Sequence, residues 1–322
     1  MLVWFSHAYT LVGNSWKEPV LIATSGRYGI GTLALDCFMI LSGFLLMEAY
    51  SNKPRIIDFW KRRFIRIYPP FLISILLISI AGIFLSDLNF IQYITSNDLF
   101  QFAENLSFFH QHFLLPSVFQ NQLHKFYAVD GSIWSLPYET LLYATIPIIF
   151  FTTNKRVSNL LLLIVISLFI ALNNRNLSRL PLFDLNVLVH LSIPFLIGVF
   201  LSNSFNIYHL ILALILINLL NFIDHKNFES ILIFGIEAIF MYLLLFSLRR
   251  IKVLYQWDLP DLSYGIFLYG FFIQQSIIEL LPYAESKFQT YLILSLVSTI
   301  LIALFSWYCI EKPFLKIKQK IA

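Results

Sequence analysis

Three ionisable residues lie inside long apolar stretches of the sequence. They are His7, Asp36 and Glu139. A charge inside a bilayer costs several kcal/mol unless it is paired or solvated. An imidazole beside a carboxylate is the usual arrangement for taking a proton from a hydroxyl, because the carboxylate orients the imidazole and stabilises its protonated form. We therefore predict that these three residues are catalytic.

The predicted depths of these residues agree. Each lies about six or seven residues from the outer end of its apolar stretch, and these ends are near Gly13, Gly29 and Ser132. Along a helix this distance is roughly 10 Å. The alternative interpretation is that the three side chains lie on different helix faces and bond to backbone or hydroxyl groups.

A second candidate site is the basic run that precedes the third apolar stretch. It contains Arg62, Arg63 and Arg66, followed by prolines at 69–70. On a helix the three guanidinium groups share one face. Guanidinium groups suit phosphate oxygens, so this face is a candidate phosphate site. The alternative is that the run serves membrane topology alone and contacts anionic lipid headgroups.

The composition indicates that these residues belong to a membrane protein. Of the 322 residues, 58% are hydrophobic and 12% are charged, which is typical of a membrane protein and excludes an ordinary soluble one. The net charge of +4 comes from Lys and Arg residues that cluster between apolar stretches, so it predicts topology rather than nucleic-acid binding. Neither a disulfide framework nor a metal site is expected from the two cysteines, Cys37 and Cys309.

Stretches of about 20 apolar residues, the length that crosses a bilayer as a helix, recur along the chain. We predict an all-α fold, a polytopic transmembrane bundle of about ten helices. The expected spans are 1–12, 29–49, 69–87, 133–151, 157–173, 186–203, 206–223, 230–248, 262–281 and 288–309. The first is too short to cross alone, so either the chain starts upstream or neighbouring helices complete it, and no signal peptide is expected.

The Lys and Arg residues predict the orientation, because cytoplasmic loops carry an excess of positive charge. With the N-terminus inside, the cytoplasmic segments 50–68, 152–156, 204–205, 249–261 and 310–322 hold 15 of the 22 Lys and Arg residues. We therefore predict a multi-pass protein of the bacterial inner (cytoplasmic) membrane with both termini cytoplasmic. One domain, 1–322, carries an outer loop at 88–132 and a cytoplasmic tail at 310–322.

The outer loop 88–132 is too polar to cross the membrane, yet it contains several aromatic residues. We expect it to pack on the bundle as short interfacial helices and to cover a site. His110 and His112 lie in this loop, but residues two apart do not face the same way on a helix, and no Asp, Glu or Cys is expected to complete a metal set with them.

Six segments, in order along the chain, resemble the integral membrane acyltransferase 3 family. They are FSH at 5–7, ALDCFMILSGFLL at 34–46, RFIRIYP at 63–69, DGSIWSLPYE at 130–139, SYGIFLY at 263–269 and IEKPF at 310–314. Members of this family O-acylate bacterial polysaccharides, lipopolysaccharide, peptidoglycan and other acceptors. The chain resembles the form without an attached esterase-like domain. It departs from the pattern in having no basic residue about ten positions before His7, and in having Tyr269 and Gly270 where the family often has a histidine.

The resemblance implies an O-acetyltransferase that moves an acyl group from cytoplasmic acyl-CoA to a hydroxyl of an extracytoplasmic glycan or lipid-linked saccharide. The phosphates of acetyl-CoA would lie against Arg63 and Arg66, with Arg62 as a helper. His7 would deprotonate the hydroxyl or carry the acyl group, and Glu139 would orient His7 or compensate its charge. The resemblance also implies membrane lipids as partners. It implies no metal and no nucleic acid.

Other residues are assigned less direct roles. Trp134 and Tyr138 are candidate substrate-binding residues that could stack on a sugar, although interfacial aromatic belts put such residues there as well. Gly43 is expected to allow close helix packing. His190 and Glu237 could line the same cavity. Asp36 has the alternative role of positioning its own helix.

Two other classes of protein would also bury ionisable groups in a bundle. A transporter or flippase of a glycan or lipid-linked precursor would be expected to show broken spans in pairs or an inverted repeat, and we find neither pattern in the sequence. In a non-catalytic membrane scaffold, the histidine and carboxylates would serve packing only. Acyl transfer from a labelled donor distinguishes the enzyme from both.

Overall fold

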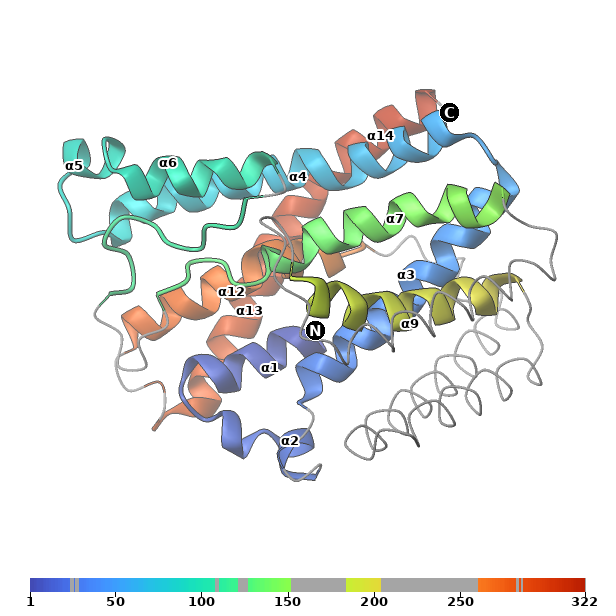
Figure 1. Cartoon of the computed structure of the whole chain (residues 1–322). Helices are drawn as coiled ribbons and strands as arrows, with labels where there is room; N and C mark the ends of the chain where they lie inside the picture. The colour runs from blue at the N-terminus through green and yellow to red at the C-terminus, as the bar shows by residue number, and fades with distance from the viewer. Residues whose placement is uncertain are drawn as a thin grey trace. The chain divides into compact units, whose positions relative to one another are not determined.

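The computed structural model describes residues 1–23, 26, 29–107, 110–120, 127–151, 184–203, 260–281, 284 and 286–321. Over these residues the secondary structure is helical and contains no strand, so the predicted all-α class is confirmed (Figure 1). The predicted spans 157–173, 206–223 and 230–248 lie outside the described residues, as does Glu237.

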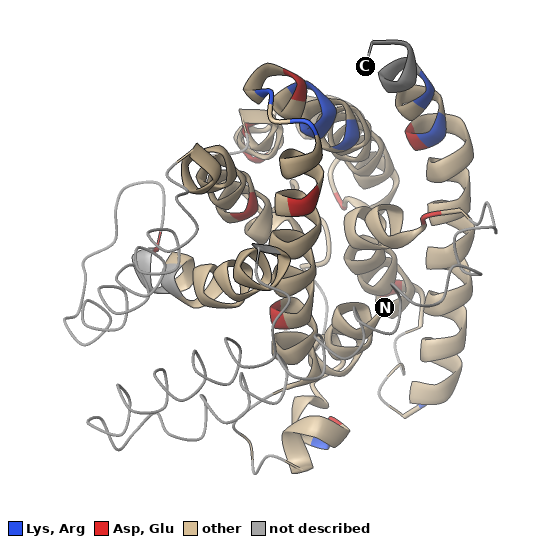
Figure 2. Cartoon of the chain, turned by 90° about the vertical axis from the view of Figure 1, so that its right-hand side faces the viewer, with Lys and Arg blue, Asp and Glu red and all other residues tan. Residues whose placement is uncertain are grey.

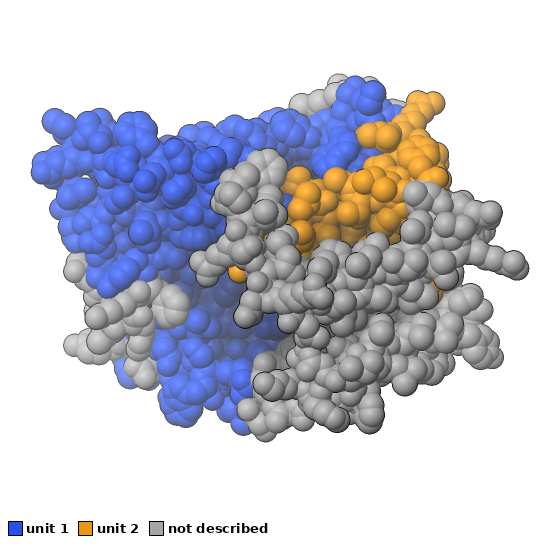
Figure 3. All heavy atoms as spheres, viewed as in Figure 1, with its two compact units in different colours: residues 1–32, 57–137, 259–322 blue, residues 33–56, 138–258 orange. Residues whose placement is uncertain are grey.

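The chain divides into two compact units (Figure 3). Unit 1 comprises 1–32, 57–137 and 259–322, and unit 2 comprises 33–56 and 138–258. The single domain expected from the sequence stays a prediction. Each unit holds part of the candidate chemistry, because His7 and the arginines belong to unit 1, whereas Asp36, Glu139 and His190 belong to unit 2.

The helices of unit 1 come from three separate stretches of the chain. They are α1 (Leu2–Leu11), α2 (Pro19–Ala23), α4 (Ile56–Leu85), α5 (Phe90–Ile94), α6 (Asn97–Glu104), α12 (Ser263–Leu280), α13 (Phe288–Ser306) and α14 (Lys312–Ile321). A π-helical turn, Trp307–Glu311, joins α13 to α14. The helices of unit 2 are α3 (Ile30–Asn52, whose first residues belong to unit 1), α7 (Leu136–Phe151) and α9 (Leu185–Asn203).

Helix α4 begins earlier than the expected span, because it continues through Pro69 and Pro70 to include the whole basic run. Proline has no amide hydrogen, so this pair removes the usual donors to the carbonyls of Ile65 and Arg66. Tyr264 from α12 donates its hydroxyl to the neighbouring carbonyl of Ile67 at 2.9 Å. The arginines therefore lie on the same helix as the apolar stretch that follows them.

Four helical segments among the described residues are long and apolar enough to cross a membrane. They are Ile30–Asn52, Ile56–Leu85, Ile133–Phe151 and Phe288–Lys316. Helix α13 exposes Ile293, Val297 and Leu301, which recur every four residues and therefore form one apolar face. Such a face suits lipid tails, in agreement with the predicted membrane class.

Loop 88–132, which belongs to unit 1, packs on the helices of that unit, as predicted. Helix α5 begins with a capping box in which Asn89 accepts from the Gln92 amide and the Gln92 side chain accepts from the Asn89 amide. Tyr93 of α5 and Phe102 of α6 are buried in one cluster with Phe71 and Ile75 of α4, and α6 runs beside α4 (Figure 1). This apolar contact holds the loop on the helices.

Candidate active site

Helix α1, which carries His7, is held in place by side-chain hydrogen bonds from α12 and α13. Trp4 donates its indole N–H to Thr299 Oγ1 at 3.2 Å, and Gln274 donates to the Trp4 carbonyl at 2.8 Å. Gly270 allows this approach, because a Cβ there would lie 2.7 Å from Trp4 Cδ1.

The imidazole of His7 is half-buried and lies edge-on to Phe271, with the ring centroids 5.2 Å apart. The same phenyl ring packs against the segment before α7, since a Cβ on Gly131 would lie 2.7 Å from Phe271 Cε2. Gln275 anchors that segment by donating to the Ala128 carbonyl at 3.0 Å. His7 and residues 128–131 thus meet at one ring of α12.

Asp130, in this segment, is a buried carboxylate that sequence reasoning used only as part of a motif. Its Oδ1 accepts from the Ser132 amide at 3.0 Å. Burial raises the pKa of Asp130 to about 8, although hydrogen bonds from the Ser132 backbone and side chain pull it down. A neutral carboxyl can also donate a hydrogen bond, so Asp130 can act as a donor or as an acceptor.

Glu18 is a second buried carboxylate that the sequence analysis missed. It accepts from the Ser6 hydroxyl at 3.1 Å and from the Ile30 amide at the start of α3. Ser6 is the residue before His7, so Glu18 ties the middle of α1 to the beginning of α3. In the sequence, Glu18 stands in a polar loop directly before Pro19, and nothing in this pattern indicated that Glu18 is buried.

In unit 2, Asp36 faces His190, with Asp36 Oδ1 3.6 Å from His190 Nε2. Asp36 is completely buried, and neither of its oxygens has a hydrogen bond within the described part of the chain. The sequence analysis paired Asp36 with the depth of His7. The structure places beside Asp36 an imidazole from α9, a residue that the sequence analysis assigned only to the lining of a cavity.

The approach of Asp36 to His190 depends on two glycines where α3 packs on α9. A Cβ on Gly43 would collide with the carbonyl oxygen of Phe195, and a Cβ on Gly198 would collide with that of Ile40. The predicted packing role of Gly43 is therefore confirmed, and Gly198 is its counterpart. Within α9, Pro194 removes the usual donor to the His190 carbonyl, which favours a bend at the histidine.

Glu139, in the first turn of α7, is also buried and accepts from the hydroxyl of Tyr143 one turn later at 3.3 Å. Tyr138 is buried beside it, and its hydroxyl oxygen accepts from the Asp184 amide just before α9 at 3.1 Å. Tyr138 therefore holds the start of α9. Trp134 is half-buried in unit 1, and its carbonyl accepts from Gln111 of the outer loop at 2.9 Å.

The basic run lies at one end of α4, and Figure 2 shows the Lys and Arg residues gathered there and on α14. Arg66 forms an ion pair with Asp261 at 2.6 Å, and both side chains are more than a third exposed. The guanidinium of Arg63 lies over the ring of Phe59, 5.9 Å from its centroid. Arg62 is half-buried in the same turn.

Asp261 is fixed at the start of α12. Its Oδ1 accepts from the Ser263 amide at 3.2 Å and from the Ser263 hydroxyl at 2.5 Å. Partial burial acts to raise the pKa of Asp261, but the hydrogen bonds from Ser263 and the charge of Arg66 outweigh it and hold the pKa below its usual value. The ionised carboxylate thus orients Arg66 while leaving other guanidinium N–H groups for an anion.

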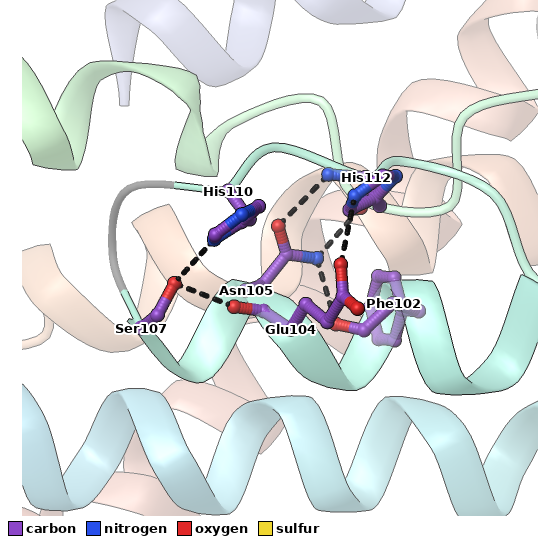
Figure 4. A network of polar contacts seen from close by, with 6 residues as sticks. All are labelled: Phe102, Glu104, Asn105, Ser107, His110 and His112. Atoms are coloured by element: carbon purple, nitrogen blue, oxygen red, sulfur yellow. Dashed lines mark hydrogen bonds and ion pairs between the residues drawn. The ribbon is translucent and has the colours of Figure 1, made fainter. Parts of the chain in front are cut away.

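The two loop histidines belong to a local network that closes the loop after α6 (Figure 4). His112 Nε2 lies 3.3 Å from Glu104 Oε2, and His110 Nδ1 lies 3.0 Å from the Ser107 hydroxyl. Asn105 donates to the His112 carbonyl at 2.6 Å and accepts from the His112 amide at 2.9 Å. Glu104 is a carboxylate neighbour that the sequence analysis did not foresee, but over the described residues no three such groups are placed to hold a metal ion.

Comparison with known proteins decides the class of this arrangement. The family model described as "Acyltransferase domain" matches residues 1–310. The chain belongs to this acyltransferase family. The resemblance found in the six motifs is therefore confirmed, and the protein is an acyltransferase rather than a flippase or a scaffold.

Two relatives illustrate the range of the family. The chain is 25% identical to an O-acetyl transferase of Shigella phage Sf6 over 336 aligned positions, which cover 98% of this chain and 92% of the phage protein. It is 39% identical to acyltransferase MdmB of Streptomyces mycarofaciens over 59 positions, which cover 18% of this chain and 14% of that protein. No solved structure matches the chain.

Proposed function

We propose that this acyltransferase moves an acetyl group from cytoplasmic acetyl-CoA to a hydroxyl of an extracytoplasmic glycan or glycolipid in the bacterial inner membrane. The observation that carries the proposal is the similarity to a phage O-acetyl transferase over 98% of the chain. The histidines and the buried carboxylates of the helices support it, because acyl transfer to a hydroxyl needs a base of this kind.

Arg63 and Arg66, with Arg62, would bind the phosphates of the donor. The Arg66–Asp261 pair supports this role, because a partly exposed pair is weakly held and a phosphate can share or replace the carboxylate. Both termini and the basic end of α4 would then face the cytoplasm. The apolar helix that continues from the arginines would lead the pantetheine arm into the membrane.

His7 would take the proton of the acceptor hydroxyl or carry the acetyl group, and Glu139 would compensate the positive charge that either role creates. Trp134 and Tyr138 would line the path of the acceptor. In the structure, Tyr138 is engaged by the Asp184 amide. We therefore assign it to shaping this path rather than to stacking on a sugar.

The test is acetyl transfer by the full-length chain. Membranes from cells that express the chain should transfer label from acetyl-labelled acetyl-CoA to cell-envelope glycan, and membranes from cells with an empty vector should not. Equal labelling of the glycan in both membranes would rule the proposal out. Comparing the acetyl groups of glycans from cells with and without the gene would identify the acceptor.

A further inference from the structure

The polar network at the end of α6 contains one buried side chain that closes the loop (Figure 4). Asn105 is 2% exposed, and its side chain bonds to the carbonyl of Phe102 and to both the carbonyl and the amide of His112. A buried amide with three bonds to the backbone is well satisfied and fixes the path of the chain around it. Asn105 is therefore the residue that holds this loop together.

Three other side chains of the network lie toward solvent, and we call Glu104, His110 and His112 the rim. The side chains of Glu104 and His112 are 53% and 33% exposed, and His110 is exposed as well. Glu104 Oε2 lies 3.3 Å from His112 Nε2, and a contact at this exposure adds little to stability. The closure of the loop does not depend on the rim, so these side chains are available to a ligand.

The rim is nevertheless well arranged. The rings of His110 and His112 are nearly parallel, at 9° to each other, with their centroids 6.4 Å apart. His110 Nδ1 lies 3.0 Å from the Ser107 hydroxyl, which donates to the Glu104 carbonyl at 2.9 Å. Fixing an exposed side chain costs conformational entropy, and a surface that is fixed in advance binds a ligand without that cost. The rim thus presents two imidazoles and a carboxylate in a set geometry.

These groups suit the hydroxyls of a saccharide. Each sugar hydroxyl both donates and accepts a hydrogen bond, a carboxylate accepts, and a neutral imidazole donates from one nitrogen and accepts at the other. Neighbouring hydroxyls of one sugar ring can therefore bond to Glu104 and to an imidazole at the same time. A metal ion fits less well, because over the described residues no three such groups are placed to hold one.

Contacts within unit 1 connect the rim to the segment directly before α7. Gln111, which lies between the two histidines in the sequence, donates to the Trp134 carbonyl at 2.9 Å. Three residues before Trp134, Gly131 packs on the ring of Phe271, and the imidazole of His7 lies edge-on to the same ring. A chain of contacts in one unit therefore links the rim to the candidate base.

We propose that the rim is a subsite that binds a saccharide unit of the acceptor glycan through its hydroxyls. The inference rests on the proposed O-acyl transfer and adds a binding site for the acceptor to it. His7 is not part of the rim, so the sugar unit bound there is a neighbour of the unit that receives the acetyl group. The rim therefore contributes to binding of the polymer and takes no part in the chemical step.

The experiment uses the purified full-length chain in lipid vesicles, with acetyl-CoA as donor and two nucleophiles. One is cell-envelope glycan from a strain that lacks the gene, and the other is hydroxylamine, which has no saccharide for the rim to bind. Glu104→Ala, His110→Ala and His112→Ala should each raise the KM for glycan by roughly 3- to 10-fold, the effect of losing a hydrogen bond. The kcat with glycan and the rate of acetohydroxamate formation should stay as in the wild type.

Two variants serve as controls. Asp98→Ala removes a carboxylate from the first turn of α6 and should leave the KM for glycan unchanged. Asn105→Ala breaks the closure of the loop, so it should lower the unfolding temperature, which the rim variants should not. A wild-type KM for glycan in a variant that lacks all three rim side chains, or an equal loss of both products, would overturn the inference. A wild-type protein that does not acetylate the glycan would instead count against the proposed function.

A second measurement does not depend on acetyl transfer. Diethyl pyrocarbonate modifies accessible imidazoles, and mass spectrometry can follow the reaction at His110 and His112. Saturating glycan should slow the modification of both rings several-fold, because a bound saccharide covers them. Glu104→Ala should need several-fold more glycan for the same protection. Modification at the same rate with and without glycan would show that the rim binds no saccharide.

Discussion

Asp36 and Asp261 each face a cation-forming side chain from another helix, and their surroundings differ. Asp261 is 40% exposed and meets Arg66 at 2.6 Å, whereas Asp36 is 1% exposed and meets His190 at 3.6 Å. An exposed pair is screened by water and readily exchanged for another ion. A buried carboxylate that loses its partner is left without compensation for its charge. The first arrangement suits binding of an anionic ligand, and the second suits proton transfer at a fixed position.

The largest effect on acetyl transfer should come from substitution of His7, whose imidazole, like that of His190, is carried by a helix. His7→Ala should abolish acetyl transfer, a loss of about 10²- to 10⁴-fold or more, because a positioned base contributes that much to rate. Glu139→Gln should reduce transfer strongly. Both variants should reach the membrane in normal amounts, as judged by immunoblotting. A purified His7→Ala protein with near-normal turnover would remove His7 from the mechanism and leave the chemistry to Asp36 and His190.

The buried pair can also be broken through its packing. Gly198→Ala places a Cβ against the Ile40 carbonyl oxygen, and overpacking of this kind costs about 1–3 kcal/mol. The helices must separate, so the variant should unfold at a lower temperature and lose glycan transfer. Phe38→Ala, at an exposed position on α3, is the control and should change stability by less than about 0.5 kcal/mol. Wild-type stability of Gly198→Ala would contradict the close helix contact.

Substitutions in the basic run of α4 should affect the binding of acetyl-CoA more than turnover. Arg66→Ala and Arg63→Ala should each raise the KM for acetyl-CoA by roughly 10- to 100-fold, because a hydrogen bond to a charged group contributes about 1.5–3 kcal/mol. Lys61→Ala is the matched control, since it removes an exposed charge from the same run. If Lys61→Ala had the same effect as the arginine variants, the run would serve membrane topology alone.

The smallest effect should come from Asp261. Because its pKa is lowered in the folded protein, the ionised carboxylate stabilises the fold above its ordinary pKa of 3.8, and this contribution is lost as the pH falls through the lowered value. Solvent screening limits it to about 1 kcal/mol or less. Asp261→Asn should therefore unfold slightly earlier than the wild type at neutral pH and equally at strongly acidic pH. A stability difference that persisted in acid would show that the charge is not its source.

Several features could be predicted from residue pattern alone. Apolar stretches predicted an all-helical fold, and the described helices agree within a few residues for 29–49, 133–151, 186–203 and 262–281. The glycine at position 43 indicated a close helix contact. The structure confirms it, because a Cβ at this position would collide with the carbonyl oxygen of Phe195. The expected span 69–87 marked only the apolar part of α4, which begins at Ile56 and continues through Pro69 and Pro70.

The candidate site, like the fold, could be predicted only in part from the sequence. Residue type and membrane depth identified His7, Asp36, Glu139 and the arginines as candidates, because a bilayer makes any buried ionisable group conspicuous. Only the tertiary structure paired Asp36 with His190, which lies 154 positions later in the sequence, and buried Glu18 against Ser6. The physical reason is that burial in lipid is a property of a single stretch and can be seen locally. The partner of a charge depends on which helices touch and at what rotation, and here the glycines at 43 and 198 and the proline at 194 decide both.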